Sequence, residues 1–308
     1  MSKIIVIGSS NTDLIAKVEK FPKAGETIKG GSYFQAMGGK GANQAVAAHR
    51  LGGTVKFVTS LGKDSNGLNS LEYYKKEGLD ASLSLVVEDI PSGVAMIWVD
   101  RKGENSIVII PGANEMLSPD YIREIEKDIL EADLIVLQME IPYDTVKTVC
   151  DIAYENNKRV LLNAAPARKL DADILKKIDI LVVNETEAEI IAGELIEHIG
   201  EEGIVDRLLA LGVNTAVLTL GKQGSILKNR QGYLRVPAFP VETVDTTAAG
   251  DTFCGALAAE LSRGRSWEET LNFASAAAAI CVTRMGAQPS IPTGTDVRNF
   301  LKIKTTNH

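Results

Sequence analysis

Five short segments of the chain are apolar at nearly every position, and this pattern constrains the fold more than any other feature. Runs without polar alternation are typical of strands that are buried on both faces of a parallel sheet. Segments with helical periodicity, such as residues 42–52 and 118–132, lie between them. We therefore predict a doubly wound, mostly parallel α/β sheet flanked by helices. The five segments are KIIVIG (3–8), DLIVLQ (133–138), RVLLNA (159–164), DILVVN (179–184) and TAVLTLG (215–221).

Two other segments, residues 14–36 and 92–110, alternate between polar and apolar positions and are interrupted by glycine or proline. This pattern predicts β-hairpins. We expect the two hairpins to meet as a small, discontinuous β lid over one edge of the sheet, with residues 1–13, 37–91 and 111–308 forming the α/β core. A lid indicates an enclosed small-molecule site. Surface hairpins without a function are the alternative.

Composition excludes several classes of protein. The 308 residues are 45% hydrophobic and 24% charged, which is typical of a folded globular chain. The formal net charge is −7 and no basic stripe is present, so we expect no nucleic-acid partner. The apolar run at the N-terminus is too short for a signal peptide, and no segment approaches the roughly 18 apolar residues of a membrane span. We expect a cytoplasmic protein without a membrane partner.

The segment VDTTAAGDTF, residues 244–253, directly precedes a long helical pattern. The backbone N–H groups around Ala248, Ala249 and Gly250 would therefore lie at a helix N-terminus, where free N–H groups and the helix dipole favour an anion. Asp251 lies in the same turn. A carboxylate beside an anion site can accept the proton of an attacking hydroxyl in phosphoryl transfer. Capping of the helix by Asp251 is the alternative.

Polar and acidic residues follow several of the predicted strands. Asn11 and Asp13 follow the first strand, Glu140 follows the strand at 133–138, and Asn184 and Glu187 follow the apolar residues ILVV at 180–183. Ligands of open α/β sheets bind beyond the carboxyl ends of the strands, so all five are candidate site residues. Asn11 and Asp13 together offer donors and acceptors for hydroxyl groups. Turn formation is the alternative for this pair, and helix capping is the alternative for Asn184 and Glu187.

The sequence MGGKGANQ, residues 37–44, opens another helical pattern. It contains the G-x-G of a dinucleotide-binding loop but lacks the third glycine, and no strand is predicted before it, so a Rossmann site is disfavoured. Gly38 and Gly39 would allow a ligand to approach the backbone, and Asn43 lies one turn into the helix. A second glycine-rich turn, residues 219–225, suits either nucleotide contact or a hairpin.

The order and spacing of these motifs resemble the ribokinase-like family of carbohydrate kinases. The resemblance covers nearly the whole chain and is carried by GSSNTD (8–13), GGKGANQAVAA (38–48), NETEAE (184–189), DTTAAGDTF (245–253) and TRMGAQPSIP (283–292). It implies an α/β core that binds a nucleotide and a sugar beneath a β lid. It also implies a phosphotransferase with an alcohol group as acceptor, which uses ATP to phosphorylate D-ribose at the 5-hydroxyl to ribose 5-phosphate.

The same resemblance implies roles for individual residues. Asp251 corresponds to the catalytic base, and Ala248, Ala249 and Gly250 correspond to the anion hole. The positions that correspond to sugar contacts are Asn11, Asp13, Gly39, Lys40, Asn43, Glu140 and Asp251. Those that correspond to nucleotide contacts are Asn184, Thr219, Gly221, Gly224, Gly250 and Ser275. Those that correspond to a monovalent-cation site are Asp245, Thr247, Cys281, Arg284, Gly286 and Ser290, while Glu187 lies in a motif associated with magnesium.

The resemblance further implies that ATP, Mg²⁺ and K⁺ take part, with K⁺ shaping the turn between Asp245 and Asp251. Lid strands have edges that could pair with a second subunit, so we predict a homodimer through the lid. A kinase of 2-deoxyribose, fructose or a nucleoside is an alternative within the same fold, although only 5% aromatic residues disfavour a shelf for a nucleobase. A non-catalytic sugar sensor is an alternative of another class, against which Asp251 argues. A nicotinamide dehydrogenase is a third, against which the missing glycine counts.

Overall fold

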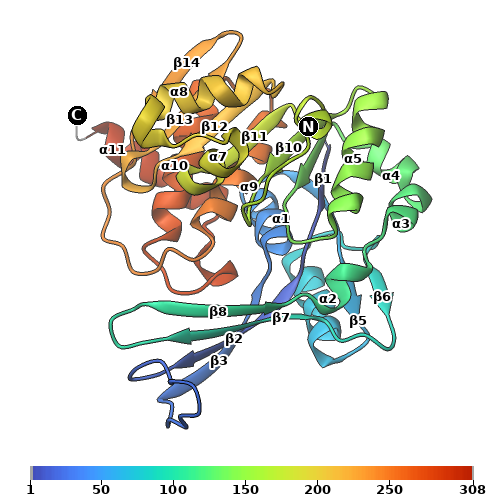
Figure 1. The fold of residues 1–308 in the computed structure, drawn as a ribbon, viewed down its shortest axis with the longest axis vertical. Coiled ribbons are helices and arrows are strands. Elements are labelled where there is room, and N and C mark those ends of the chain that lie inside the picture. Colours follow the sequence, from blue (N-terminus) through green and yellow to red (C-terminus); the bar gives the residue numbers. More distant parts are fainter. Residues whose placement is uncertain (1–2, 307–308) are drawn as a thin grey trace.

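The computed structural model describes residues 3–306, and an eight-stranded sheet runs through its centre (Figure 1). The strand order is β14-β13-β12-β11-β10-β9-β1-β4, parallel from β12 to β4, with β13 and β14 added antiparallel at one edge. The strands are β1 Lys3–Ile7, β4 Thr54–Val58, β9 Leu134–Leu137, β10 Arg159–Asn163, β11 Ile180–Asn184, β12 Thr215–Thr219, β13 Ser225–Asn229 and β14 Gly232–Val236.

The five apolar runs of the sequence are the five central strands of this sheet, which confirms the predicted fold class. Both faces of the sheet are covered, and successive residues of one strand enter different cores. In β1, for example, Ile5 and Ile7 pack in one hydrophobic cluster, whereas Ile4 and Val6 pack in the other. Because side chains alternate along a strand, only a sheet buried on both sides requires every position to be apolar.

Helices cover the two faces in separate layers. One core includes residues of α3 to α8, and the other includes residues of α1, α2, α9, α10 and α11. None of the helices within residues 3–306 combines the length and hydrophobicity of a bilayer span. The helices are α1 Lys40–Arg50, α2 Ser65–Glu77, α3 Pro119–Glu124, α4 Glu126–Leu130, α5 Tyr143–Glu155, α6 Ala172–Leu175, α7 Glu185–Ala192, α8 Ile196–Ala210, α9 Ala249–Leu261, α10 Trp267–Cys281 and α11 Gly294–Thr306, with 3₁₀ turns η1 Gly112–Met116, η2 Gly221–Gln223 and η3 Gln288–Ser290.

A separate four-stranded sheet projects from one end of the molecule (Figure 1). Its order is β3-β2-β7-β8, with β2 and β7 parallel and the outer pairs antiparallel. These strands are β2 Asn11–Lys17, β3 Ser32–Gly38, β7 Gly93–Val99 and β8 Asn105–Ile110, and a two-stranded sheet joins β5 Ser60–Gly62 to β6 Leu85–Val87. The expectation that no strand precedes the MGGKGANQ segment was wrong, because β3 runs up to Gly38. That strand pairs antiparallel in the small sheet, so the segment still does not follow a strand of the parallel sheet.

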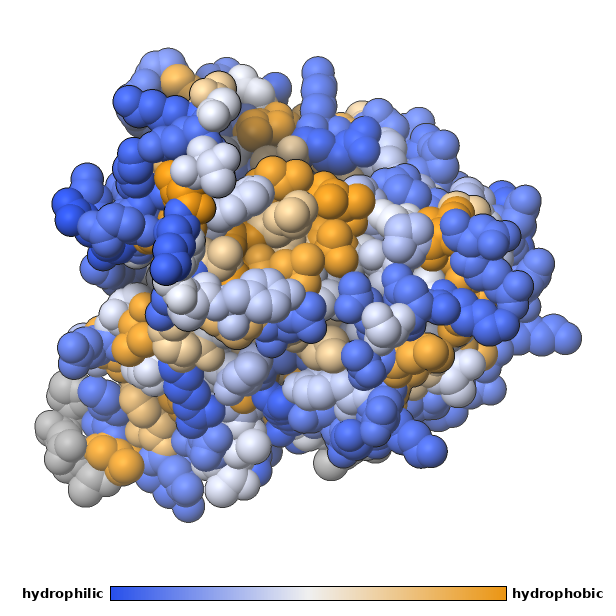
Figure 2. Space-filling model, turned by 90° about the horizontal axis from the view of Figure 1, so that it is seen from below, coloured by the Kyte–Doolittle hydropathy of each residue, from blue (hydrophilic) through white to orange (hydrophobic). Residues whose placement is uncertain are grey.

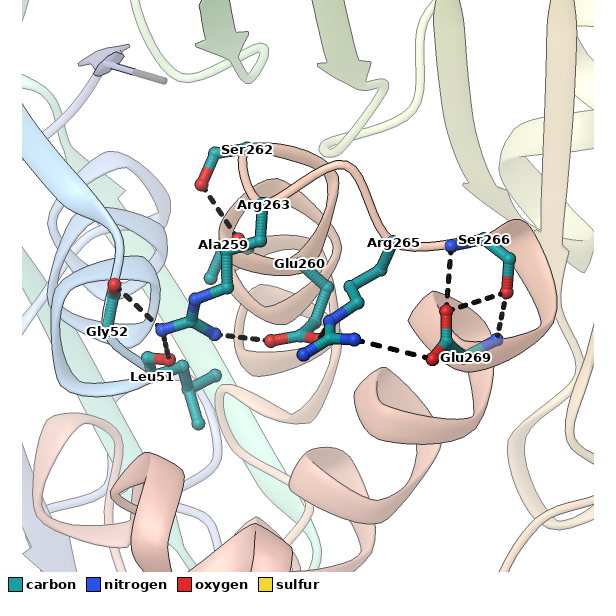
Figure 3. A network of polar contacts seen from close by, with 9 residues as sticks. All are labelled: Leu51, Gly52, Ala259, Glu260, Ser262, Arg263, Arg265, Ser266 and Glu269. Atoms are coloured by element: carbon teal, nitrogen blue, oxygen red, sulfur yellow. Dashed lines mark hydrogen bonds and ion pairs between the residues drawn. The ribbon is translucent and has the colours of Figure 1, made fainter. Parts of the chain in front are cut away.

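Helices α1 and α9 lie against each other with unusually close backbones. A Cβ atom on Gly255 of α9 would lie 2.5 Å from Ala47 Cβ of α1. At the far ends of the same helices, Arg263 donates hydrogen bonds to the carbonyl oxygens of Leu51 (3.0 Å) and Gly52 (2.8 Å) and pairs with Glu260 (Figure 3). The two helices are thereby held in a fixed register. This register matters because both helix N-termini carry residues of the candidate site.

Candidate active site

Asp251 lies in the first turn of α9 but does not cap the helix. The N-cap residue is Ala248, in the left-handed conformation (φ 59°), and no side chain caps the turn. Asp251 is 7% exposed, and its carboxylate instead accepts hydrogen bonds from two amides of α1. Asn43 Nδ2 donates to one oxygen at 2.9 Å and Gln44 Nε2 donates to the other at 3.0 Å. The carboxylate is therefore held in one orientation by groups outside its own helix.

The N-terminus of α9 also presents free backbone donors. The N–H group of Ala249 donates to the carbonyl oxygen of Thr246 (3.2 Å), whereas those of Gly250 and Asp251 have no acceptor within residues 3–306. A Cβ atom on Gly250 would meet no atom within 4 Å outside its chain neighbours and the backbone of its own helix, so the space in front of the turn is open. Free N–H groups at a helix N-terminus attract an anion. A fixed carboxylate and an anion-binding turn thus occupy the same place.

Gln44 belongs to a buried amide network that the sequence did not reveal. Its Nε2 donates to Asn163 Oδ1 (3.1 Å) as well as to Asp251, and its Oε1 accepts from Gln138 Nε2 (2.8 Å). Gln44 and Gln138 are both fully buried. The network joins α1 to β10 and to the segment after β9, so it connects the orientation of Asp251 to the central sheet.

Asn11 and Asp13 lie in the first half of β2 rather than in a turn. Both are buried, and the Asp13 carboxylate packs against Gly38 of the neighbouring strand, where a Cβ atom would be 2.3 Å from its oxygens. Gly39 follows at φ 88°, and a Cβ atom there would be 2.8 Å from the Asn11 nitrogen. Burial, followed by the negative charges of Glu140 and Asp251, raises the pKa of Asp13 to about 7.

Glu140 and Lys40 lie close to Asp13 and Asp251, and together these four residues form a cluster of three carboxylates and one ammonium group. Glu140 Oε2 accepts hydrogen bonds from Ser9 Oγ (2.6 Å) and from the Lys40 backbone N–H (3.0 Å), and Ser9 was not singled out from the sequence. Burial alone would lower the pKa of Lys40, but the charges of Asp251 and the neighbouring glutamates outweigh burial and raise it. The ammonium group therefore stays charged among carboxylates. The structure thus brings together the residues predicted to contact a sugar, from β2, α1, α9 and the segment after β9.

Asn184 and Glu187 form a reciprocal cap at the start of α7. Asn184 Oδ1 accepts from the Glu187 N–H (2.9 Å), and Glu187 Oε2 accepts from the Asn184 N–H (2.9 Å), so the capping interpretation is confirmed. Glu187 is nevertheless buried, and burial is the main cause of its raised pKa, with Lys40 opposing and Asp251 adding to the shift. Glu187 therefore interacts electrostatically with Lys40 and Asp251 of the candidate site. A role for Glu187 besides capping stays a prediction.

The glycine-rich turn after β12 is a hairpin. It joins β12 to the antiparallel β13 through η2, with Gly221 at φ 52° and Gly224 at φ 98°. Thr219 lies beside Asn184 in the parallel register of β12 and β11, at the carboxyl edge of the sheet. Ser275 is buried in α10, which packs against α9. Nucleotide contact by these residues stays a prediction.

The residues expected at a cation site form a loop cluster beside α9. The Asp245 carboxylate accepts from Thr247 N (2.9 Å), Thr247 Oγ1 (2.6 Å) and Gly286 N (2.9 Å). Burial opposes ionisation of Asp245, but these hydrogen bonds outweigh it and lower its pKa. Cys281 Sγ lies 3.6 Å from Thr247 O and 3.0 Å from Ser290 Oγ. The Arg284 side chain points elsewhere, toward Asp296 (3.5 Å).

Phosphoryl transfer requires a group that accepts the proton of the attacking hydroxyl and donors that stabilise negative charge. The fixed carboxylate and the free N–H groups at this helix N-terminus can supply both. The sequence matches the pfkB family of carbohydrate kinases over residues 1–294. The chain therefore belongs to the pfkB carbohydrate kinase family, whose members are phosphotransferases that act on a sugar hydroxyl.

Characterised relatives extend over the full length of the chain. The ribokinase of Haemophilus influenzae is 42% identical over 303 residues, which cover 97% of this chain and 98% of the relative. The deoxyribokinase of Salmonella typhi is 37% identical over 306 residues, covering 97% and 99%. The solved structure of Arabidopsis thaliana ribokinase complexed with ribose and ATP is 34% identical, with a TM-score of 0.91 and coverage of 98% and 99%.

Proposed function

We propose that this chain uses ATP to phosphorylate D-ribose at its 5-hydroxyl, giving ribose 5-phosphate. The observation that carries the proposal is the Asp251 carboxylate, fixed by Asn43 and Gln44 and placed beside the free N–H groups of its own helical turn. Ribokinases over the whole chain length support ribose as the acceptor. The resemblance of the Salmonella deoxyribokinase keeps 2-deoxyribose as the second candidate acceptor.

In this mechanism Asp251 accepts the proton of the sugar hydroxyl as its oxygen attacks the γ-phosphorus of ATP in line and the bond to the ADP oxygen breaks. The N–H groups of Gly250 and Asp251, with Ala248 and Ala249 completing the turn, receive the negative charge of the transferred group. The amide donors of α1 keep the carboxylate turned toward the hydroxyl. Orientation and charge stabilisation together supply most of the rate enhancement in such a reaction.

The sugar would lie between β2 and α1. Asn11, Asp13 and Glu140 supply donors and acceptors for its hydroxyl groups, and Lys40 supplies positive charge beside them. The close approach of Gly39 to the Asn11 backbone leaves no room for a side chain there, so the peptide itself can face the ligand. Asn43 completes the proposed sugar site while it holds Asp251.

The nucleotide would lie along the carboxyl edge of β11 and β12. We assign Asn184, Thr219, Gly221, Gly224 and Ser275 to it, because the first four lie at that edge and Ser275 lies on the helix that packs against α9. Mg²⁺ would accompany ATP and neutralise phosphate charge. We assign the buried Glu187 carboxylate to Mg²⁺, because Glu187 interacts electrostatically with Lys40 and Asp251.

K⁺ would be held by the loop cluster beside α9. This cluster consists of Asp245, Thr247, Cys281, Gly286 and Ser290, together with the Arg284 backbone. No group of three His, Cys, Asp or Glu side chains that could hold a metal ion occurs within residues 3–306, so a closed transition-metal site does not fit. A single carboxylate with a lowered pKa, in a loop cluster that also contains the Thr247 carbonyl oxygen, suits a weakly held monovalent cation better. K⁺ should raise the melting temperature of the wild type more than that of Asp245→Asn, with Na⁺ as control. An equal rise in both would contradict the assignment.

The small sheet would act as a lid and as a dimer contact. Its edge strand β8 is exposed along its whole length, and Ile107, Val108, Ile109 and Ile110 are 44–50% exposed. Figure 2, which views the molecule from the side of the small sheet, shows apolar side chains gathered on this face. An unpaired apolar edge strand favours pairing with a second copy. A monomeric mass in solution at micromolar protein concentration would overturn the proposed dimer.

A cytoplasmic location stays a prediction from the sequence.

The proposed function is tested by ADP release from ATP and Mg²⁺ with ribose, 2-deoxyribose, fructose and adenosine in parallel, each with and without K⁺. We expect the highest kcat/KM on ribose and a higher rate with K⁺. A preference for 2-deoxyribose would retain the mechanism and change the substrate. Ribose binding without turnover on any acceptor would instead support a sugar sensor.

A further inference from the structure

Asn114 lies in η1, where the chain returns from β8 of the small sheet to the core. It is 2% exposed, and none of its contacts follows from a motif in the sequence. Its side chain makes four hydrogen bonds. Asn114 Oδ1 accepts from Ser10 N (2.9 Å), and Asn114 Nδ2 donates to Asn11 Oδ1 (2.8 Å), Pro111 O (2.9 Å) and, more weakly, Ser10 O (3.2 Å).

These contacts fix which way round the amide lies. The backbone N–H of Ser10 can only donate, so the atom of Asn114 that faces it must be the oxygen. The nitrogen of Asn114 then faces two backbone carbonyls and the side chain of Asn11. Because this nitrogen can only donate, the Asn11 atom that faces it must be an oxygen. The backbone N–H of Ser10 thereby fixes the orientation of both side-chain amides, those of Asn114 and Asn11.

The consequence concerns Asn11. Its Oδ1 is occupied by Asn114, and its Nδ2 has no hydrogen-bond partner within the described part of the chain. The pair is also packed tightly, since a Cβ atom on Gly93 would lie 2.2 Å from Asn114 Nδ2 and 2.3 Å from Asn11 Oδ1. Asn11 therefore cannot turn its amide over without breaking a buried contact. It is preset as a hydrogen-bond donor.

We propose that Asn114 is a positioning residue of the sugar site, which holds the Asn11 amide with its nitrogen turned toward the sugar. The proposal rests on the proposed function, because that assigns Asn11 to the sugar. Asn11 then offers a hydrogen-bond donor and Asp13 offers an acceptor beside it. Two neighbouring sugar hydroxyls can thereby be distinguished, because one accepts from Asn11 and the other donates to Asp13. If Asn114 were lost, Asn11 could present either atom, and part of the bound population would face the sugar with the wrong one.

The test is a double-mutant cycle on Asn11→Ala, Asn114→Ala and the double variant, with KM and kcat measured for ribose and KM for ATP. We expect Asn114→Ala to raise the ribose KM about tenfold, with a smaller effect on kcat and none on the ATP KM. In the Asn11→Ala background the same change should leave the ribose KM nearly unaltered, because the residue through which Asn114 acts is gone. If Asn114→Ala does not fold, Asn114→Asp keeps the acceptor for Ser10 N–H and carries the same expectation.

The matched control is Ser92→Ala, at the residue directly before β7. Ser92 Oγ accepts from Gly62 N (3.0 Å) and donates to Asp64 (2.7 Å), so its loss removes two hydrogen bonds close to Asn11 that involve neither Asn11 nor Asn114. It should lower the melting temperature but leave the ribose KM unchanged. An unchanged ribose KM in folded Asn114→Ala, or effects that multiply in the double variant, would overturn the proposal. An unchanged ribose KM in Asn11→Ala would instead remove the assigned sugar role of Asn11 itself.

Discussion

Replacing Gln44 with methionine should destabilise the protein and slow the reaction, because this one buried amide connects the catalytic carboxylate to the sheet. The substitution keeps the length of the side chain but removes three hydrogen bonds, to Asp251 (3.0 Å), Asn163 (3.1 Å) and Gln138 (2.8 Å). It also leaves the Gln138 nitrogen and the Asn163 oxygen without these partners in a buried region. Methionine recovers part of the loss through its greater hydrophobicity.

The expected loss of unfolding free energy is about 3 kcal/mol, from about 2 kcal/mol for the bond to the carboxylate, about 1 kcal/mol for each stranded partner and an offset of about 1 kcal/mol. For a chain of this size that corresponds to a fall in melting temperature of roughly 5 °C. If the bond to Asp251 acts fully in the transition state, kcat should fall by about 30-fold.

Gln288→Met is the matched control for this prediction. Gln288 is also fully buried, but neither its nitrogen nor its oxygen has a hydrogen-bond partner in the described part of the chain. The same substitution should therefore leave its melting temperature unchanged or raise it, because it removes two unpaired polar atoms. Calorimetric unfolding of the two variants decides the matter. Equal shifts in both would refute the reasoning, since burial and not hydrogen bonding would then determine the cost.

Two further predictions concern the anion-binding turn and the acidic cluster. Gly250→Val should leave the melting temperature within about 2 °C of the wild type, because the new Cβ would meet no atom within 4 Å outside its chain neighbours and the backbone of its own helix. It should nevertheless raise the ATP KM by blocking the open turn, and a normal ATP KM would contradict the anion hole. Because the pKa of Asp13 is raised to about 7, the folded state holds a proton that the unfolded state has released, so stability falls as pH rises from about 4 to about 7. Asp13→Asn should lack this contribution, so between pH 5 and pH 8 the unfolding free energy of the variant should gain on that of the wild type by at most about 3 kcal/mol. Parallel pH profiles would count against a neutral, buried Asp13.

Five strands of the main sheet could be predicted because the physics that selects them is local. A strand buried on both faces must be apolar throughout, so β1, β9, β10, β11 and β12 were evident as uninterrupted apolar runs. The small sheet could likewise be read from its alternating pattern. The limits of its strands could not, because β2 begins at Asn11 and β3 continues to Gly38, where pairing overrides the weak strand preference of asparagine and glycine.

The candidate site was predictable only in part. Asp251 and the turn before it combine two signals within a few residues, whereas the groups that orient this carboxylate are far away in sequence. Gln44 lies 207 positions from Asp251, and Asn114 lies 104 positions from Ser10. No spacing rule relates such pairs, because their contact depends on how α1, α9 and the small sheet pack. Gln44 stood in a motif already noted, but only the packing of α1 on α9 turns it toward the carboxylate.

The central claim is that Asp251 accepts the proton of the sugar hydroxyl, and Asp251→Asn tests it most directly. The asparagine keeps the shape of the side chain and one acceptor for the amides of α1, but it cannot take the proton. We expect kcat for ADP release with ribose to fall by about 10²- to 10⁴-fold, while calorimetry shows ribose affinity within a few-fold of the wild type. Turnover close to that of the wild type, with ribose bound equally well, would contradict the account.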